Sequence, residues 1–456
     1  MPTKGFVRKN RGRTPARAGE DSGVSKGNGT NSPIEDEGAS SAPPRSPRGR
    51  HKQSNSVRDP CEKNCLEKSP SPLSKTTGCA SKSRAAETDV HQVLSTTLGK
   101  LRIRKTTRSE STAVINTIVE NIIKYFKNRT DCFNQVTSLR TGSYYENVKV
   151  GQPDEFDVIL AIRVPSVDLR PFGDDGAFYS VAVKNTRRHL LTDFLQGDGI
   201  VSASEMLAKF RAHVKNALKS TAMTDVQVER KKKGSPAVTL LVKENGLQIS
   251  LDVVLGLEVH SAWPSFTKTG FLIEKWLGTK VKKDFRFKPF YLVPKYEGNG
   301  SDALDGIYAK DAWRISFSHV EKDILKYHGS AKTCCEAEGT KCCRRECLKL
   351  LKHLLEKLKE KYPKDLSKFC SYHAKTMLFH ACVKHVYDSD WKMEQLDLCF
   401  LRLLEDFQNR LRGGFLPNFF IPTHNVLGSK CNRRSCELLA EYIDFEKINM
   451  FPIFLE

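Results

Sequence analysis

The stretch from Leu139 to Leu160 constrains the fold more than any other part of the sequence. It ends in Glu155-Phe156-Asp157-Val158, where two acids alternate with two apolar residues. Side chains of a β-strand point alternately to its two faces, so Phe156 and Val158 are predicted to enter a core while both acids face the other side. The sequence therefore predicts a strand that presents two carboxylates to one spot.

Two carboxylates this close repel each other, and a divalent cation between them removes the repulsion. A third acid, Asp252, stands in an otherwise apolar strand. Because a buried acid without a partner is costly, Asp252 is a third metal ligand, half of a cross-strand salt bridge or a residue of an edge strand. Upstream, Gly142 lets the chain approach a triphosphate closely, and Ser143 offers it a hydroxyl and a backbone N–H. The acids and this turn together predict a nucleotidyl-transfer site that depends on Mg²⁺ or Mn²⁺.

The net charge of this 456-residue chain is +21, and its pI is near 9.3. A charge this large favours a polyanionic partner, either nucleic acid or an anionic membrane surface. The hydrophobic content of 39% is enough for one bilobal unit or two domains. No run of about 18 apolar residues occurs, and the first residues lack the apolar core of a secretory signal, so an intracellular chain with reduced cysteines is expected.

The first 90 residues are predicted to be a disordered basic arm. They contain 17 Lys/Arg and 10 Asp/Glu, a net of +7, and Phe6 is their only aromatic residue. Such a segment cannot bury enough apolar surface to offset its ordering entropy. We expect the arm either to attach non-specifically to nucleic acid or phosphoinositide head groups, or to serve only as a solubilising, modifiable tail. Since the rest of the chain keeps a net of +14, the folded part needs a basic face of its own.

Residues 91–275 are predicted to form a mixed α/β catalytic lobe around a twisted sheet. Apolar residues at helical spacing predict one long helix from Val90 through Phe126, and a capping box at Ser202 predicts a second helix. Asn245-Gly246 predicts a two-residue hairpin. Strands are expected at 156–165, 225–229, 237–242 and 247–259.

Past Tyr291 the sequence pattern is helical almost to the end, which predicts a helical second lobe over 276–456. Amphipathic stretches occupy 320–327, 345–362, 371–386, 396–411 and 435–446. The fold class is therefore α+β and bilobal, with a catalytic cleft between a sheet lobe and a helical lobe.

A dense group of cysteines lies within 328–347 and predicts a structural zinc site in the helical lobe. One histidine and five cysteines can supply the four ligands of tetrahedral zinc. The spacing departs from the common Cys-x2-Cys pattern, so the ligand set stays open, and reduced buried cysteines are the alternative. The group consists of His328, Cys334, Cys335, Cys342, Cys343 and Cys347.

Basic residues gather near the start of the first long helix and around the cysteine group. Cations beside a rigid metal loop suit a duplex backbone, where phosphate contacts fix the register without reading the sequence. A solvated helix face is the alternative for each of them. These residues are Arg102, Arg104 and Lys105, and then Lys322, Lys326, Lys341, Arg344, Arg345 and Lys349.

Motifs along the chain from about Lys100 to the C-terminus resemble those of the vertebrate cyclic GMP-AMP synthases, a DNA-sensing family with the nucleotidyltransferase fold. The cysteine insertion separates this family from the oligoadenylate synthetases, which lack it. The motifs are Thr141-Gly-Ser-Tyr-Tyr145, Glu155-Phe-Asp157-Val, Leu251-Asp-Val253, Trp263-Pro264, Phe290-Tyr-Leu-Val-Pro-Lys295, Trp313-Arg-Ile-Ser-Phe-Ser318-His and the His328/Cys group.

The resemblance implies an innate immune sensor of double-stranded DNA in the cytosol and nucleus. It implies that duplex DNA of any sequence reorders the loop carrying Ser143, and that the active form is a dimer clamping two duplexes. ATP and GTP would be joined first into a linear 2′-5′ dinucleotide and then into 2′-5′/3′-5′ cyclic GMP-AMP. The basic arm could add contacts to chromatin and to anionic lipid.

The resemblance also implies roles by motif position. It implies Mg²⁺ ligands (Glu155, Asp157, Asp252), zinc ligands (His328, Cys334, Cys335, Cys342), purine contacts (Arg314, Ser316, Ser318), phosphate contacts (Lys352, Ser371), a stacking ring (Tyr372) and DNA contacts (Lys295, Lys322, Arg345, Lys349). One departure is Val254, which stands where a base-selecting Thr is expected and cannot make that hydrogen bond.

Two other functions compete with this one. An oligoadenylate-type or poly(A)-type transferase would make linear oligomers from ATP alone, and the cysteine group argues against it. A non-enzymatic nucleic-acid or chromatin binder on a decayed scaffold is disfavoured by the three intact acids. Charge alone does not separate DNA from RNA as the activator.

Overall fold

A computed structural model describes residues 79–164, 167–183, 189–221, 223–244, 246–331, 334–335, 341–428 and 430–456. Most of the expected arm, 1–78, lies outside the described residues. Its last part is not an arm, because helix α1 (Cys79–Lys100) begins there and buries Val90 and Leu94 against the helical lobe. No helix in the described ranges is long and apolar enough to cross a membrane.

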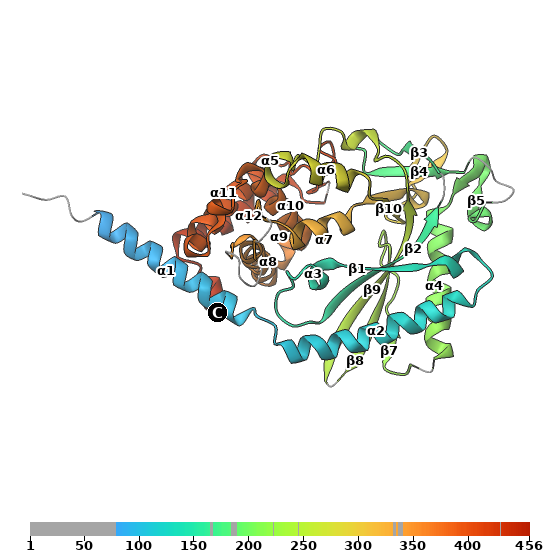
Figure 1. The fold of residues 1–456 in the computed structure, drawn as a ribbon, viewed down its shortest axis with the longest axis horizontal. Helices are drawn as coiled ribbons and strands as arrows, with labels where there is room; N and C mark the ends of the chain where they lie inside the picture. Colours follow the sequence, from blue (N-terminus) through green and yellow to red (C-terminus); the bar gives the residue numbers. More distant parts are fainter. Residues whose placement is uncertain are drawn as a thin grey trace, which may run out of the picture. The chain divides into compact units, whose positions relative to one another are not determined.

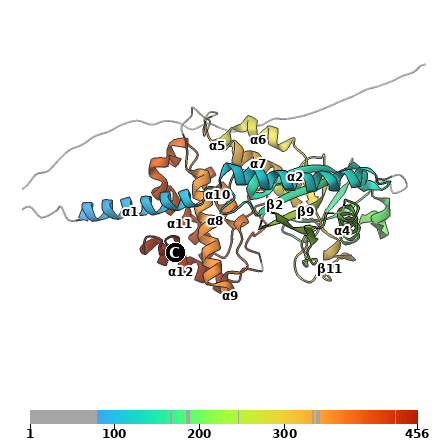
Figure 2. The same ribbon diagram turned by 90° about the horizontal axis from the view of Figure 1, so that it is seen from below.

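The sequence predicts one long helix from Val90 to Phe126, but the structure has two helices there. The prediction is wrong between Lys100 and Lys105, where the first helix ends and the second begins. The chain leaves α1 after Lys100, and Arg104 has an extended backbone just before α2 (Lys105–Lys127). The break lets α1 pack on helices of the C-terminal lobe while α2 packs on the sheet lobe (Figures 1 and 2). Helical periodicity alone does not reveal a break between two correctly spaced segments.

The described residues form an eleven-stranded mixed sheet, and its order is β1-β2-β9-β10-β13-β4-β6-β5. Strand β3 pairs with β4, and β7 pairs with β8, which pairs with β9. Strands β2 and β9 run parallel, and their remaining partners are antiparallel. The strands are β1 (Thr137–Thr141), β2 (Glu155–Val164), β3 (Asp168–Pro171), β4 (Phe178–Ala182), β5 (Leu195–Gln196), β6 (Ile200–Val201), β7 (Val226–Val228), β8 (Ala237–Glu244), β9 (Leu247–Val259), β10 (Phe290–Val293) and β13 (Trp313–Ser316).

One face of the sheet carries the main core. Phe156 and Val158 are fully buried there with residues of α2 and of α4 (Ala203–Ser220), as the alternation predicted. The opposite face near the acids carries only a small apolar cluster around Ile159 and Tyr291. Ser202 caps α4 by accepting from the Glu205 N–H, which confirms the predicted start of this helix.

The boundary predicted between residues 275 and 276 is wrong, because the sheet continues beyond it. Strand β10 pairs with the last part of β9, and β13 pairs with β10. A small separate hairpin, β11 (Ala303–Leu304) with β12 (Ile307–Tyr308), lies between them. These strands have at most four residues, too few to stand out against a helical pattern in the sequence.

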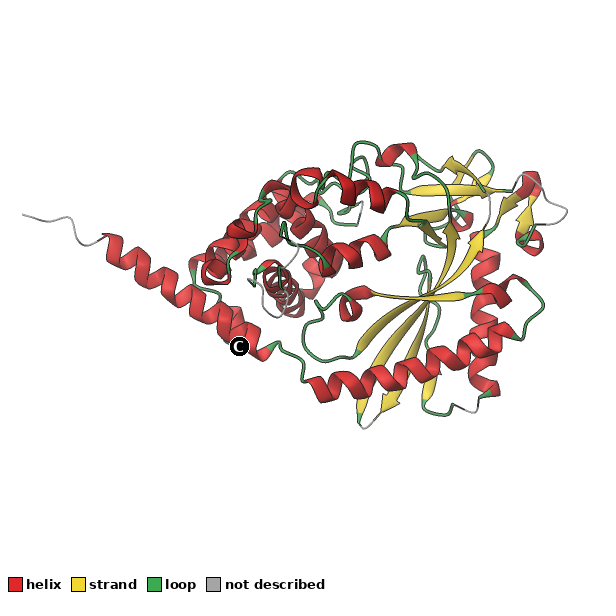
Figure 3. Ribbon diagram, in the orientation of Figure 1, coloured by secondary structure: helices red, strands yellow, loops and turns green. Residues whose placement is uncertain are grey.

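The helical lobe follows β13. In Figure 3 its helices, drawn in red, gather to the left of the yellow strands of the sheet. All five amphipathic stretches predicted beyond residue 319 are helices. Two short helices, α5 (Glu274–Leu277) and α6 (Thr279–Arg286), lie between β9 and β10. The helices after β13 are α7 (Ser318–Lys326), α8 (Arg344–Lys361), α9 (Pro363–Leu366), α10 (Ser371–Lys384), α11 (Leu396–Arg412) and α12 (Arg433–Ile448).

Candidate active site and metal centre

The three predicted acids lie side by side on two neighbouring strands. In the parallel β2–β9 pair, Asp157 stands opposite Asp252 and Glu155 stands opposite Ser250. Glu155 and Asp157 are two residues apart, so both lie on the face opposite to Phe156. The structure therefore brings all three carboxylates together on one face of the sheet.

The carboxylates perturb one another. Burial raises the pKa of Asp157 to about 7, and the charges of Glu155, Asp252 and Glu146 add to the rise. Burial also raises the pKa of Asp252, although the Thr239 hydroxyl donates to its carboxylate at 2.6 Å. A divalent cation would remove the repulsion, and a set of carboxylate oxygens fits Mg²⁺ or Mn²⁺.

Gly142 allows the chain to pass directly against these acids. It begins the short helix α3 (Gly142–Tyr145) with φ +81°, and an added Cβ would lie 1.9 Å from Asp157 Oδ2. Neither the conformation nor the space admits a side chain. Ser143 follows immediately, so the structure brings the predicted Gly-Ser turn and the acids together.

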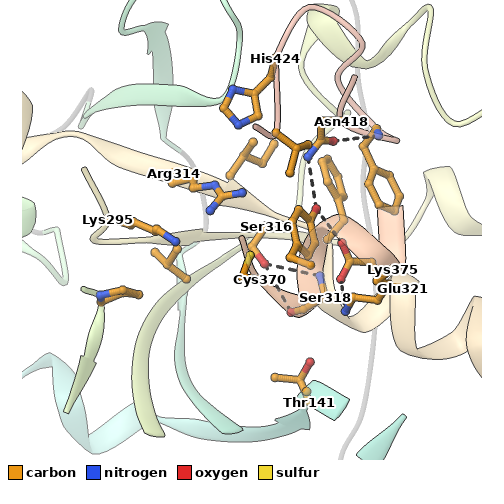
Figure 4. A pocket seen from close by; sticks show the side chains of 18 of the residues that line it. Thr141, Lys295, Arg314, Ser316, Ser318, Glu321, Cys370, Lys375, Asn418 and His424 are labelled. Atoms are coloured by element: carbon orange, nitrogen blue, oxygen red, sulfur yellow. Dashed lines mark hydrogen bonds and ion pairs between the residues drawn. The ribbon is translucent and has the colours of Figure 1, made fainter. Parts of the chain in front are cut away.

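A cavity of about 480 Å³ opens beside Gly142 and Asp157 (Figure 4). Gly142 and Asp157 line one side, and residues of β13, α7 and α10 line the other. Its size is within the range of small-molecule sites. Four of the predicted nucleotide contacts line it, namely Arg314, Ser316, Ser318 and Tyr372.

Lys295 also lines this cavity, and its role as a DNA contact stays a prediction. It follows strand β10, whose Val293 pairs with Arg314 of β13, and this register places the two cations on one wall (Figure 4). The charge of Arg314 and then burial lower the pKa of Lys295 to about 8. An anionic ligand would stabilise both cations.

Two residues predicted to touch phosphate, Lys352 and Ser371, do not line the cavity. Lys352 is buried on α8 and donates its Nζ to the Val148 carbonyl at 2.8 Å. Burial lowers its pKa to about 8. Ser371 is exposed at the start of α10. The packing of α8 therefore directs Lys352 to the segment before the acids, and its phosphate contact stays a prediction.

A buried ion network that the sequence did not predict forms part of the cavity wall. Lys375 Nζ lies 3.0 Å from Glu146 and 2.8 Å from Glu321. The Tyr372 hydroxyl donates to Glu321 at 3.0 Å and accepts from Asn418 at 3.2 Å. Because buried charges are costly without partners, this network ties α3 to α7 and α10. Each member occupies an ordinary polar position in the sequence, so no local pattern marks it.

The cysteine group forms a compact four-residue centre. The ligand atoms of His328, Cys334, Cys335 and Cys342 all lie within 4.8 Å of one another. His328 Nδ1 is 2.9 Å from the Leu325 carbonyl, and its Nε2 is buried without a hydrogen-bond partner in the described chain. A histidine held in this way offers Nε2 to a metal. One imidazole and three thiolates suit tetrahedral zinc.

Comparison with known proteins agrees with this geometry. Residues 144–327 match the Mab-21 protein nucleotidyltransferase domain, and residues 343–445 match the Mab-21 protein HhH/H2TH-like domain. The cyclic GMP-AMP synthase of Sus scrofa is 44% identical over 79% of this chain and 72% of its own length. That of Mus musculus is 45% identical over 78% and 69%. The chain belongs to the cyclic GMP-AMP synthase family. It is a nucleotidyltransferase.

A more distant relative has a related description. A cyclic GMP-AMP synthase-like receptor of Microplitis demolitor is 25% identical over 72% of this chain and 60% of its own length.

In this member of the cyclic GMP-AMP synthase family, the predicted DNA contacts have different surroundings. Lys322 donates to the Arg140 carbonyl at 2.9 Å and lies 5.8 Å from the Tyr145 ring, so α7 touches the strand that leads into Gly142. Four of the others are exposed (Arg102, Arg104, Lys105, Lys326), and two are half-buried (Arg345, Lys349).

Arg344 is not available to DNA, and that prediction is wrong. It is fully buried, its Nη1 lies 2.6 Å from Asp388 Oδ1, and its guanidinium lies 5.4 Å from the Trp391 ring centre. Asp388 also accepts from the Ser330 and Ala331 N–H groups, just after His328. The Arg344 side chain, at the start of α8, therefore turns inward and supports the segment just after His328.

Replacing Arg344 by Met should lower the free energy of unfolding by about 3–5 kcal/mol, because it leaves Asp388 without its buried partner. Urea unfolding measures this loss, and the affinity of the folded fraction for duplex DNA should stay unchanged. The matched control is Arg345→Met, one position along α8, which should weaken DNA binding at little cost in stability. Loss of DNA affinity without loss of stability in Arg344→Met would contradict this assignment.

Cys370 gives the cavity a reactive thiol. It lines the cavity, and its sulfur caps α10 together with His373, whose Nε2 is 4.0 Å away. Burial raises the pKa of the Cys370 thiol. His373 and the backbone N–H groups of Tyr372 and His373 lower this pKa by more than burial raises it, so the net value is about 6.

The thiolate of Cys370 is populated above its pKa, so alkylation by iodoacetamide should reach half its maximal rate near pH 6. Peptide mass spectrometry over a pH series checks this midpoint. Cys436 is fully buried and is the internal control that should stay unmodified. A midpoint near the ordinary thiol pKa would show that the helix start and His373 do not stabilise the thiolate.

Proposed function

We propose that this chain is a cyclic GMP-AMP synthase activated by double-stranded DNA. It joins ATP and GTP into a cyclic dinucleotide with one 2′-5′ and one 3′-5′ linkage. One observation carries the proposal. Asp157 and Asp252 face each other on parallel strands, with Glu155 beside them, against a glycine turn at a cavity of nucleotide size.

The cavity residues supply binding and orientation. Lys295 and Arg314 present positive charge to a triphosphate, and Tyr372 offers its ring to a purine. Mg²⁺ held by the three acids would activate the attacking ribose hydroxyl and neutralise the leaving pyrophosphate. Val254 lines the cavity without a hydroxyl, so we propose that purine selection relies on Arg314 and its serine neighbours.

The contacts of α7 and α2 support control by DNA. Lys322 of α7 binds the carbonyl of Arg140, directly before the Thr141–Gly142 turn. Arg108 of α2 lies 5.1 Å from the Tyr144 ring of α3, and the Tyr144 hydroxyl donates to the Arg108 carbonyl at 2.8 Å. Phosphates that bind these cations would shift their contacts to the active-site turn.

Further features belong to the same proposal. The active form is a homodimer on sequence-independent duplex DNA, with zinc in the His328 centre stabilising part of the DNA-binding face. The protein acts in the cytosol and nucleus in antiviral innate immunity. The basic arm, outside the described residues apart from its end, adds contacts to chromatin and anionic lipid.

Mass spectrometry of the reaction product tests this function. Purified full-length protein with Mg²⁺, ATP and GTP should yield the cyclic dinucleotide only when duplex DNA is present. Duplex RNA of the same length is the matched control and should give no product. Equal product without DNA would refute activation, and linear oligomers from ATP alone would assign an oligoadenylate-type activity instead.

A further inference from the structure

Lys149 makes an ion pair with the candidate metal ligands that neither the sequence pattern nor the proposed reaction explains. Its Nζ lies 3.0 Å from Asp154 Oδ1 and 3.1 Å from Glu155 Oε2. The lysine side chain is only 12% exposed, whereas that of Glu155 is 57% exposed. A largely buried ammonium group therefore binds the most accessible acid of the site.

The surrounding segment fixes Lys149 in this position. Its neighbours Val148 and Val150 are buried on either side of it. The Val148 carbonyl accepts from the buried Lys352 of α8, and Glu146 is paired with Lys375 of α10. The segment 146–154 is thus anchored to the helical lobe, so the lysine reaches Glu155 from a supported backbone.

We propose that Lys149 is a built-in competitor of the divalent cation for Glu155, and that segment 146–154 must move before this acid can bind metal. The inference rests on the proposed metal-dependent transfer. An ammonium group and a divalent cation on the same carboxylate repel each other at a separation of a few ångströms. Of the three site acids, Glu155 alone makes an ion pair among the described residues, so while the lysine stays only Asp157 and Asp252 are free to bind the cation.

A contact with α2 gives DNA a means of moving this segment. Arg108 is exposed on α2, and its Nη2 donates to Asn147 Oδ1, two residues before Lys149. Asn147 has φ +60°, an uncommon conformation for a residue other than glycine, so this contact helps to hold a strained position. A phosphate that takes Arg108 from Asn147 would remove this support and favour withdrawal of Lys149 from Glu155.

Mn²⁺ binding to the zinc-loaded full chain, followed by electron paramagnetic resonance of the free ion, tests the inference without relying on catalysis. In the absence of DNA, Lys149→Gln should bind Mn²⁺ about fivefold more tightly than the wild type, as expected for loss of one half-exposed ion pair. Duplex DNA should narrow this difference. Lys149→Arg keeps the charge and should behave like the wild type.

Lys384→Gln is the matched control, because it removes a lysine paired with Asp406 at 2.7 Å on the exposed surface and should leave Mn²⁺ affinity unchanged. Unchanged or weaker binding in Lys149→Gln would overturn the inference, since the lysine would then be neutral toward the metal or would orient Glu155 for it. Absence of Mn²⁺ binding in every variant would overturn it as well.

Product analysis of the same samples separates this inference from the proposed function. Tighter Mn²⁺ binding in Lys149→Gln with no dinucleotide product in any sample would refute the function and leave the competition established. DNA-dependent product with unchanged Mn²⁺ affinity would refute the competition alone.

Discussion

Replacing Asp157 by Asn should reduce dinucleotide synthesis about a thousandfold or more. The amide keeps the shape of the side chain but removes the negative charge at the centre of the acid group, where divalent cations stabilise the reacting phosphates by several kcal/mol. Product formation with duplex DNA present, measured by mass spectrometry, gives the loss. The matched control is Asp168→Asn on β3, a half-exposed acid paired with Arg170, which should leave the rate unchanged.

The same variant should not be less stable. The pKa of Asp157 is raised from 3.8 in the unfolded chain to about 7 in the folded one. The free energy of unfolding of the wild type therefore falls as the pH rises above 4, and this loss grows until about pH 7. The Asn variant has no such loss. Without added divalent cations, the melting temperature of Asp157→Asn should match the wild type in acid and exceed it increasingly up to neutral pH. A variant that retains activity, or that loses it only by unfolding, would contradict the assigned role.

Replacing Cys342 by Ser should remove the bound zinc and lower the melting temperature by roughly 5–10 °C. A serine hydroxyl is a poor zinc ligand, and the proposed zinc would join Cys342 to His328, Cys334 and Cys335. Elemental analysis gives zinc per chain, and calorimetry gives the melting temperature. We expect weaker DNA activation as well, because α8 with Arg345 and Lys349 begins directly after this centre.

Cys370→Ser is the control for this prediction, because that cysteine lies outside the metal centre and should not change the zinc content. Zinc retained in Cys342→Ser would show that another thiol completes the ligand set. Zinc lost at an unchanged melting temperature would show that the metal does not stabilise the fold.

The elements that sequence reasoning predicted well depend on short-range geometry. Two acids at alternate positions of a strand share a face wherever that strand packs, so Glu155 and Asp157 could be paired in advance. Asp252 was assigned through its odd place in an apolar strand, and the β2–β9 register brings it opposite Asp157. The cysteines are close in sequence, so their meeting needed only a tight loop.

What sequence reasoning missed concerns mainly charged residues whose surroundings come from distant parts of the chain. Arg344 follows the same basic pattern as Arg345, yet the packing of α8 against the segment around Asp388 buries it completely. Lys295 faces the cavity because β10 pairs with β13. The break between α1 and α2 likewise follows from which lobe each helix packs on.

The sequence by itself determined that the chain carries the acids, the glycine turn and the His328/Cys group, because these are specified by residue type and local spacing. Only the tertiary structure decided which lysines and arginines serve the cavity, the core or the surface, and which of them hold the active-site segment. The physical reason is that a long charged side chain can lie in water or pair in the interior at similar sequence positions, and its partner is chosen by the packing of elements far apart in the chain.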